Sequence, residues 1–556
     1  MRNPETILNN LVKSADKKDY KFQRLYRNLF NKEFYIVAYT RLAHKGSNFT
    51  KGISDIAIDR FSLKRVDELI GQMRTEKYQP KSARLMHILK SNGKRRRLGI
   101  SNFNDKLVQE VIKMILEAIY EKTYSQNSHG FRPNRSCHTA LVEIKCNFIG
   151  SRWFIKGDIH SFVNNMNHHI LINLLRKKIE DERFLRLIWK FLRAGYAEEW
   201  VFHKTYSGCP QGGIISPILS NIYLNELDMY VEEYKSKFDK GKEREKDSEY
   251  KNIYNKICTR QKKLTKLKIN DEKYEEMLSE IKDLKKKMHE ISEVNQIDKE
   301  YRRLYYTRYA DDFIIGLIGS KEEAIKIKDD IEKFLKSKLD IVLSGEKRCI
   351  THSNKFVHFL GYNIAISRKN DGKKTFKSSK KKIRNLQCEL YLSQDIWIKK
   401  LKELGIFRIK KDGTWIAKPR LYLMNLSDAE ILNIYNNEIR GLYNYYKLAK
   451  NISVLKHFVY YMKYSLYMTL TSKYNSSISR IIRKYSFQGT FRVSYRTNTE
   501  EKYLYLYNKK FKMDFCVNKN SKVDTIATNY QYCYSTKLTQ RYYQTSLNSI
   551  KRQKEQ

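Results

Sequence analysis

The sequence is short of acidic residues relative to basic ones. Asp and Glu number 61 against 109 Lys and Arg, so the formal net charge is +48. This surplus argues against an acidic small-molecule enzyme or a neutral extracellular scaffold, and it is typical of proteins that bind nucleic acid or anionic membrane. The chain is 41% hydrophobic and 13% aromatic, which is too apolar for a wholly disordered protein.

Three further features are missing. No uncharged apolar run reaches about 18 residues, so we expect no membrane-spanning helix. The N-terminus has no apolar signal core, and its early acidic residues are unlike a transit peptide. The eight cysteines form no C-x-x-C pair, which gives little support to a disulfide framework or a structural zinc site. These absences favour a reducing, internal compartment.

The order of sequence patterns predicts several domains, about three or four for 556 residues. Residues 1–75 read as mostly helical with a loop at 44–48, and residues 76–228 mix short β-type runs with helical periodicity. The charge-dense residues 229–300 predict a solvated helical insertion. The heptad spacing of apolar residues over 277–291 leaves a partner-binding coiled coil as an alternative. Short strands are expected over 301–365, and helices from about 380, one of them opened by a capping box at 427–430.

Carboxylates stand where strand-like runs end. Asp311 and Asp312 lie between two such runs, so a hairpin would bring both to its tip, and Asp158 ends the run WFIKGD. Crowded carboxylates repel one another, and a divalent cation such as Mg²⁺ relieves that repulsion. Carboxylates that bridge two such ions are what in-line phosphoryl transfer needs. From these residues alone, an exposed acidic turn and a plain strand-end aspartate remain alternatives.

Eight segments, read in order, resemble the reverse transcriptase and maturase proteins encoded within group II introns. The resemblance runs from about residue 20 to 490. The segments begin at Tyr26 (YRNLFNKEF), Asn92 (NGKRRRLGI), Ser128 (SHGFRPNRS), Trp153 (WFIKGDIHSF), Gly208 (GCPQGGIISP), Tyr301 (YRRLYYTRYADD), Leu343 (LSGEKRC) and Arg440 (RGLYNYYKLAK).

The resemblance implies an α+β fold, a right-hand reverse transcriptase followed by an α-helical thumb. Residues 1–75 would extend the fingers, 76–370 would form fingers and palm around the insertion at 229–300, and 380–490 would form the maturase (X) domain. Residues 491–556 would be a basic C-terminal segment, either a reduced DNA-binding region or added RNA-facing charge. The H-N-H endonuclease of many relatives is not expected, because Cys516 and Cys533 stand alone and no histidine follows His457.

The resemblance also implies roles for single residues. Asp158, Asp311 and Asp312 match the catalytic aspartates, which hold Mg²⁺ together with the carbonyl of Ile159. The nucleotide-binding positions are Lys94, Arg96, Val163, Gln211 and Lys347. The RNA-binding positions are Arg132, Arg135, Arg440, Tyr445, Lys456 and Lys463. A plain solvated charge is the alternative for each lysine, and helix capping or an internal salt bridge is the alternative for Arg132 and Arg135.

Two segments depart from the family pattern. Val163 and Asn164 stand where the family commonly has an aromatic residue and Asp, and the aromatic ring there packs under the nucleotide sugar. A one-residue shift of the strand would place Phe162 there instead. In the first fingers segment, RRLGISN lacks two expected prolines. These departures bear on whether the polymerase is active, not on RNA binding.

The resemblance therefore implies an intron maturase that binds its group II intron RNA and promotes splicing, with an active or relic RNA-directed DNA polymerase site. The alternatives are a fully active reverse transcriptase used in retrohoming and a bacterial reverse transcriptase outside introns. Target DNA, and an RNA template with a DNA primer, are further expected partners. No membrane partner is expected, and the oligomeric state is open, a dimer included. The expected location is a plastid or mitochondrion, with a bacterial cytoplasm as the alternative.

Overall fold

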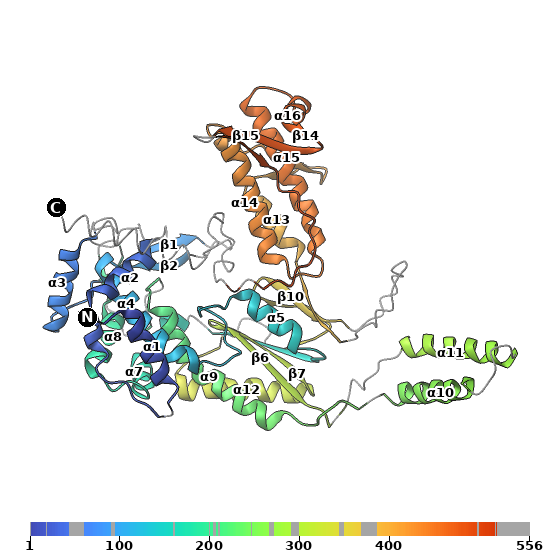
Figure 1. The fold of residues 1–556 in the computed structure, drawn as a ribbon, viewed down its shortest axis with the longest axis horizontal. Helices are drawn as coiled ribbons and strands as arrows, with labels where there is room; N and C mark the ends of the chain where they lie inside the picture. The colour runs from blue at the N-terminus through green and yellow to red at the C-terminus, as the bar shows by residue number, and fades with distance from the viewer. Residues whose placement is uncertain are drawn as a thin grey trace.

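The computed structural model separates into N-terminal helices, a mixed body and an upright helical domain (Figure 1). This arrangement of helices and sheets confirms the expected α+β class. The described residues are 2–17, 19–43, 61–89, 95–159, 162–198, 201–203, 207–208, 212–245, 247–265, 272–290, 298, 300–343, 350–367, 386–496, 500–517 and 519.

The main elements of the described N-terminal residues are helices. They are α1 (Pro4–Ala15), the 3₁₀ helix η1 (Tyr26–Phe30), α2 (Lys32–Ala43) and α3 (Leu63–Arg74). The predicted loop at 44–48 lies outside the described residues. The buried residues of α3 recur at helical spacing and form one apolar stripe, namely Val66, Leu69, Ile70 and Met73. Helices α1 and α2 both pack against α4 (Phe103–Tyr120), which joins this extension to the body.

The fingers contain a four-stranded sheet in the order β2-β1-β4-β5. Its strands are β1 (Ala83–Leu89), β2 (Arg95–Ile100), β4 (Tyr196–Glu198) and β5 (Val201–His203). The helices of this region, besides α4, are the 3₁₀ helix η4 (Glu121–Thr123), α7 (His168–Arg176) and α8 (Glu182–Arg193). Because neighbours cover α4 on nearly every side, it forms the centre of the first hydrophobic core.

The palm is a second four-stranded sheet, in the order β6-β7-β3-β8. Its strands are β3 (Trp153–Asp158), β6 (Arg303–Tyr309), β7 (Asp312–Ile318) and β8 (Ile350–His352). Its helices are α5 (Cys137–Asn147), α6 (Phe162–Asn165), α9 (Ser216–Phe238) and α12 (Lys321–Leu339). Phe313 and Ile315 enter the core that contains α9 and α12, whereas Ile314 enters the core that contains α5. Both faces of the sheet are therefore covered (Figure 1).

The charge-dense segment forms a helical hairpin that starts later than predicted. Val231 is buried in the palm core, so the residues up to the end of α9 belong to the palm. Two backbone hydrogen bonds between Lys240 and Arg302, of 3.0 and 3.2 Å, close the insertion at its base. Beyond them, α10 (Ser248–Leu264) and α11 (Glu272–Glu290) pack against each other away from the body (Figure 1). Ile257 and Ile281 are their buried residues, so part of the predicted apolar seam is used within the chain.

The upright domain is helical with small sheets added, which helical periodicity alone does not predict. Its helices are α13 (Gln394–Glu403), η5 (Leu421–Leu423), α14 (Asp428–Tyr446), η6 (Ile452–Val454), α15 (Leu455–Lys473) and α16 (Ile478–Tyr485). Its strands, with those at its base, are β9 (Val357–Phe359), β10 (Tyr362–Ile366), β11 (Cys388–Tyr391), β12 (Phe407–Ile409), β13 (Trp415–Ala417), β14 (Ser486–Phe487), β15 (Thr490–Arg496) and β16 (Glu501–Tyr505). The predicted capping box is present, with Ser427 and Glu430 bonding reciprocally.

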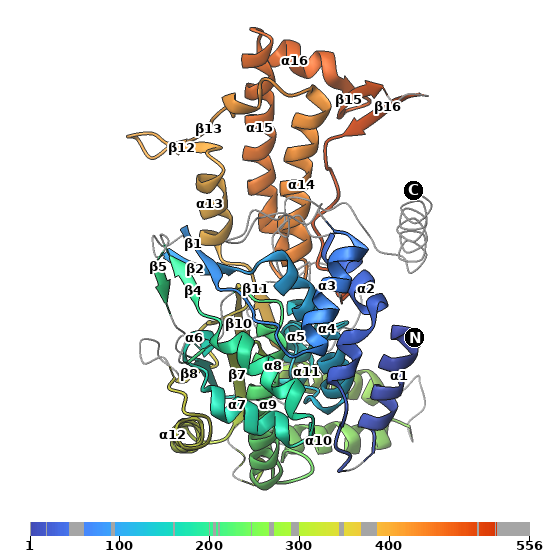
Figure 2. The same cartoon turned by 90° about the vertical axis from the view of Figure 1, so that its left-hand side faces the viewer.

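The residues after 490 continue this domain. Phe491 and Val493 are buried in the core that contains α5 and the helices of this domain, which is the second hydrophobic core, and Leu504 and Phe511 pack against it. Figure 2 shows β15 and β16 beside α14 and α16. The backbone N–H of Asp514 donates to the carbonyl of Lys447 at 2.9 Å. The described part of the C-terminal segment is thus part of the helical domain. No helix in the described ranges is both long and apolar enough to cross a bilayer.

Asp105 of α4 should make the free energy of unfolding fall as pH rises from about 4 to about 6. Burial raises the pKa of Asp105 to about 6, and hydrogen bonds from the Tyr78 hydroxyl and the Lys81 N–H offset only part of this effect. The folded state therefore holds the proton more tightly than the unfolded state, so stability is gained at low pH and lost as pH rises through the raised pKa. About two pKa units correspond to roughly 2–3 kcal/mol.

Urea unfolding between pH 4 and 7 measures this effect. Asp105→Asn should flatten the fall in stability across that window. Asp67→Asn removes a half-exposed carboxylate of α3, paired with Lys32, and should leave the fall unchanged. An unaltered pH profile in Asp105→Asn would contradict the assignment.

Candidate active site and nucleic-acid interface

The sequence YADD at 309–312 forms the predicted hairpin tip. Strands β6 and β7 pair antiparallel from Arg303 opposite Ile318 to Tyr309 opposite Asp312, leaving a two-residue turn. Ala310 has a φ of 56°, the positive value that two-residue hairpin turns require. The turn places Asp311 at the tip, and Asp312 begins β7.

Asp158 lies directly beside this tip. Strand β3 pairs antiparallel with β7, and the register places Asp158 opposite Asp312. Opposed residues of neighbouring strands point to the same face with their Cβ atoms about 4.5–5.5 Å apart. All three aspartates are partly exposed, and each makes further polar interactions. Ile159 follows Asp158 with 2% exposure, and its backbone bridges to Leu343.

A buried ion pair supports the turn from below. Arg308, the residue before Tyr309, has no exposed side-chain surface, and neither does Asp228 of α9. Arg308 Nε and Nη2 donate to the Asp228 carboxylate at 2.7 and 2.6 Å, and the Tyr306 hydroxyl donates to it at 2.7 Å. Burial alone would lower the pKa of Arg308, but Asp228 outweighs it and raises that pKa, so the guanidinium stays charged. Arg308 Nη1 also donates to the carbonyl of Ala310 at 2.8 Å, which fixes the turn to the palm helix.

The SHGF segment packs against the same turn. A Cβ on Gly130 would lie 2.3 Å from the backbone N of Ala310, so only glycine allows this approach. Asn221 of α9 donates to the Gly130 carbonyl at 2.8 Å. Arg308 Nη2 donates to Ser128 Oγ at 2.8 Å. The segment and α9 therefore hold the acidic turn from two sides.

The glycine-rich loop before α9 touches the fingers. Gly212 has a φ of 111°, and a Cβ there would lie 2.6 Å from the carbonyl oxygen of Gly99 in β2. At the other end of the loop, the Gly208 carbonyl lies 2.5 Å from His168 Nε2. Strand β2, which contains Arg96, is thus next to the loop that contains Gln211. The structure does not describe Gln211, Lys94, Lys347 or the side chain of Arg96.

Phe162 does not line the acidic site. Its side chain is 2% exposed in the first core, and its ring packs edge-on against Tyr223 with centroids 5.9 Å apart. Val163 is the next residue of α6, and its side chain lies outside the described part. The alternative in which Phe162 faces the sugar therefore conflicts with its position.

The donor chemistry of the acidic site suits a hard divalent cation, because it combines carboxylates on neighbouring strands with a nearby backbone carbonyl. The register brings Asp158 and Asp312 together with Asp311 one residue away. No group of three or more His, Cys, Asp or Glu side chains in the described ranges is already arranged to hold a metal ion. The three aspartates are therefore of a type that fits the ion. The pairing of β3 with β7 brings them near one another, but their side chains are not yet arranged around a common point.

The expected RNA-binding residues fall into two groups. Arg132 is used internally, because its guanidinium donates to Glu121, to the Ser125 carbonyl at 2.6 Å and to the Ser128 carbonyl at 2.8 Å. This is the internal role that the sequence left open for it. Tyr445 is also internal, and its hydroxyl donates to the Leu360 carbonyl at 3.1 Å.

Other members of that set reach the surface. Arg135 is partly exposed while bonded to Gln126, and Arg440 is half-buried above the ring of Tyr507, at 5.8 Å. Lys456 and Lys463 are exposed on α15.

Sequence reasoning missed two sets of residues. Tyr460 and Tyr464 are exposed on the same face of α15 as Lys456 and Lys463, with ring centroids 4.6 Å apart. Their four-residue spacing was a usable signal for that face. The second set that the sequence did not predict is the buried Arg308–Asp228 pair. Eighty residues separate its members, and no local pattern joins them.

These features define a reverse transcriptase with a maturase domain. The chain matches the family model for reverse transcriptase (RNA-dependent DNA polymerase) over residues 88–292 and the model for type II intron maturase over residues 392–545. The second match extends past the predicted boundary at 490, in line with the packing of residues 491–511. Neither match is to an endonuclease.

Relatives place the chain in a family. The group II intron-encoded protein LtrA of Lactococcus lactis subsp. cremoris is 42% identical over 488 residues, covering 87% of this chain and 80% of that protein. A putative COX1/OXI3 intron 1 protein of Saccharomyces cerevisiae is 34% identical, covering 82% and 54%. The Arabidopsis thaliana protein named nuclear intron maturase 1, mitochondrial, is 26% identical, covering 49% and 42%. The chain belongs to the family of group II intron-encoded reverse transcriptases and maturases.

Asp228→Asn should destabilise the palm by about 3–5 kcal/mol, because it leaves the buried Arg308 charge without its carboxylate. Urea unfolding measures the loss. Asp329→Asn is the matched control, since that carboxylate of α12 is half-exposed and its pairing with Lys328 is worth less than about 1 kcal/mol. Equal losses of unfolding free energy in the two variants would show that the buried pair stabilises the palm no more than the exposed pair does.

Proposed function

We propose that this protein binds the group II intron RNA that encodes it, promotes splicing of that RNA, and copies RNA into DNA at the palm site. The RNA performs the splicing transesterifications, and the protein stabilises the active RNA fold. The observation that carries the polymerase part is the register that places Asp158 opposite Asp312 beside the YADD turn. Family membership and the +48 charge support the RNA-binding part.

We assign the palm residues to Mg²⁺ and nucleotide handling. Asp158 and Asp311, with the carbonyl of Ile159, would hold Mg²⁺, and Asp312 would assist from the neighbouring strand. Mg²⁺ bound there would lower the pKa of a primer hydroxyl and offset the charge of the leaving pyrophosphate. Lys94 and Arg96 would contact the triphosphate, and Gln211 would lie beside the incoming nucleotide. Lys347 would supply a proton to pyrophosphate.

The thumb supplies the RNA surface in this proposal. Lys456 and Lys463 lie on α15 beside the exposed rings of Tyr460 and Tyr464. Cations contact phosphates, and tyrosine rings stack on unpaired bases, so such a face suits folded RNA. Arg135 adds a partly exposed cation, held by the Gln126 carbonyl. Target DNA, and a primer–template duplex, would use the same basic surfaces during retrohoming.

The proposed location is wherever the intron is transcribed. Relatives include a Lactococcus protein and a plant protein whose name places it in mitochondria. This pattern fits an organelle, as proposed from the sequence, and it fits a bacterial cell as the alternative.

Loss of the tip carboxylates should separate the two activities. Asp311→Asn with Asp312→Asn should reduce cDNA synthesis by at least about a thousandfold, because two of the carboxylates proposed to hold Mg²⁺ lose their charge. Intron splicing by the same protein should stay within about twofold, because RNA shape recognition uses other surfaces. Primer extension on an RNA template and a splicing assay with the intron RNA measure the two effects.

The isosteric amides keep the shape of the turn, and circular dichroism checks that the variant is folded. Asp329→Asn on α12 controls for the loss of a palm carboxylate away from the turn. If splicing fell together with cDNA synthesis in a folded variant, the two activities would share the acidic site and this division would be wrong.

Because of Val163, the polymerase should discriminate poorly between dNTP and rNTP. Valine leaves space where an aromatic ring would exclude a 2′-hydroxyl, and each tenfold of selectivity costs about 1.4 kcal/mol at the transition state. Val163→Phe should therefore raise the preference for dNTP over rNTP by roughly one to three orders of magnitude. Single-nucleotide incorporation on a primed RNA template measures it.

Phe162→Leu is the matched control. Phe162 is buried against Tyr223, so this change should cost stability and leave sugar selectivity unchanged. Selectivity that collapsed in Phe162→Leu and did not respond to Val163→Phe would make Phe162 the gate.

A further inference from the structure

One buried glutamine joins the two elements that are proposed to contact the incoming nucleotide. Gln109 lies in the second turn of α4 and is 5% exposed. Its amide oxygen accepts a hydrogen bond from the backbone N–H of Ile214 at 2.8 Å, and its amide nitrogen donates to the Ser101 hydroxyl at 3.3 Å. Ser101 follows the last residue of β2, and Ile214 lies between the glycine pair of the loop and the start of α9.

The orientation of the amide follows from its partners. A backbone N–H can only donate, so the oxygen of the Gln109 amide faces Ile214 and the nitrogen faces Ser101. A lysine has no acceptor and an aliphatic side chain has neither group, so neither could make both bonds. The position therefore uses a long side chain that has an acceptor and a donor at the same end.

A second contact between the same two elements uses no hydrogen bond. Gly212 lies so close to Gly99 of β2 that a Cβ on Gly212 would be 2.6 Å from the Gly99 carbonyl oxygen. A steric contact of this kind stops the loop from coming nearer to β2, but it does not stop the loop from moving away. The two hydrogen bonds of Gln109 supply the attraction that holds the loop against the strand.

The acidic turn has other supports. Arg308 and Asp228 tie it to α9, and Gly130 packs against it. The hydrogen bonds of Gln109 go instead to Ser101 and Ile214. A change at Gln109 should therefore alter how a nucleotide is held and leave the carboxylates in place.

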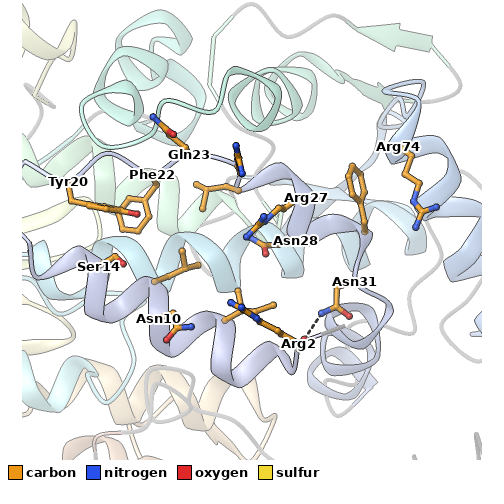
Figure 3. Close-up of a pocket in the computed structure, with 15 residues that line it drawn as sticks. Arg2, Asn10, Ser14, Tyr20, Phe22, Gln23, Arg27, Asn28, Asn31 and Arg74 are labelled. Atoms are coloured by element: carbon orange, nitrogen blue, oxygen red, sulfur yellow. Dashed lines mark hydrogen bonds between the residues drawn. The ribbon is translucent and has the colours of Figure 1, made fainter.

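The basic cavity of the N-terminal part is also separate from this bridge. That cavity, of about 690 Å³, is lined by residues of the α1 segment, of 20–31 and of α3 (Figure 3). Figure 3 shows Arg27 of η1 facing Arg2 across it, and Asn31 Nδ2 donates to the Arg2 carbonyl at 2.9 Å. None of its described lining residues belongs to β2, α4 or the glycine-rich loop. A change at Gln109 should thus leave these cations in place.

We propose that Gln109 is a positioning residue for nucleotide addition. By joining the end of β2 to the loop before α9, it holds Arg96 and Gln211 at the spacing that one incoming dNTP requires. The inference rests on the proposed function, because those two residues contact a nucleotide only if the palm site is a polymerase. Without the bridge, the nucleotide would have to order the loop as it binds, and its affinity would fall.

Two variants of Gln109 and one control test this role. Gln109→Met keeps the length of the side chain and removes both hydrogen bonds. Gln109→Glu is the conservative variant, because it keeps an oxygen that accepts from the Ile214 N–H. Asn436→Leu is the matched control. The Asn436 amide is 1% exposed and also accepts from a backbone N–H at 2.8 Å, that of Tyr507, but it lies in α14 of the thumb. Urea unfolding shows that each variant is folded.

Single-nucleotide incorporation at saturating primer–template gives KM and kcat for a dNTP. Gln109→Met should raise KM about tenfold and leave kcat within about threefold. A tenfold change corresponds to about 1.4 kcal/mol, which is the size expected for one lost hydrogen bond. Gln109→Glu should stay within about threefold of the native KM. Asn436→Leu should keep the native KM, because a smaller folded fraction lowers only the apparent kcat.

Nucleotide affinity is also measured without chemistry. A dNTP is titrated into the full chain bound to a primer–template whose primer lacks a 3′-hydroxyl. The Kd of the dNTP should rise about tenfold in Gln109→Met, and the affinity for the primer–template should stay within about twofold. If the native chain bound the dNTP but did not extend an ordinary primer, the polymerase part of the proposed function would fail. The Kd ratio would still decide the role of Gln109.

Three results would overturn the inference. A fall in kcat with unchanged KM and Kd in Gln109→Met would show that Gln109 serves stability alone. An equal rise of KM in Asn436→Leu would show that the effect is not local to the bridge. A KM as high in Gln109→Glu as in Gln109→Met would show that the bond to Ile214 is not what matters. A native chain that bound no dNTP would overturn the polymerase assignment and the inference with it.

Discussion

The ion pair between Arg308 and Asp228 is the contact on which the palm site depends. Both side chains are wholly buried, so each charge would be costly to bury without the other. The same guanidinium reaches Ser128, Asn221 and the carbonyl of Ala310. One side chain thus joins the acidic turn to a palm helix and to the segment after the fingers. A hydrophobic pair of similar size could fill the space but could not direct a hydrogen bond to the turn.

The palm sheet adds a second constraint, because its two faces serve two cores. Ile314 packs with the core of the maturase domain, and its neighbours Phe313 and Ile315 pack with the core of the fingers and palm. A one-residue slip of β7 would exchange every one of these contacts and would also move Asp312 away from Asp158. The register that aligns the carboxylates is therefore fixed by apolar packing along the rest of the strand.

The local parts of this site were predictable from sequence, and the long-range parts were not. The YADD tip, the end of β3 at Asp158 and the capping box at Ser427 all depend on neighbouring residues, and the structure contains all three. In the sequence, Arg308 cannot be told from the many other cations, because its partner Asp228 lies 80 residues away. The predicted start of the insertion, residue 229, is too early for a similar reason, because α9 continues in the palm to Phe238. The polar face of α9 near residue 229 looks solvated, and only its contact with the palm reveals Val231 as core.

Helix α5 links the two activities proposed for this chain. On its palm side, Glu143 accepts one hydrogen bond from Thr307 of β6 and pairs with His129 beside the acidic turn. Burial lowers the pKa of His129, so Glu143 faces a histidine that is harder to protonate. On its other side, His138 Nε2 contacts the Tyr445 carbonyl at 2.8 Å, and Lys145 pairs with Glu389 at 3.1 Å. An RNA bound to the thumb, as proposed, would contact a domain that α5 joins to the acidic turn. The proposed RNA surface and the proposed polymerase site are therefore joined by one helix, although they consist of different side chains.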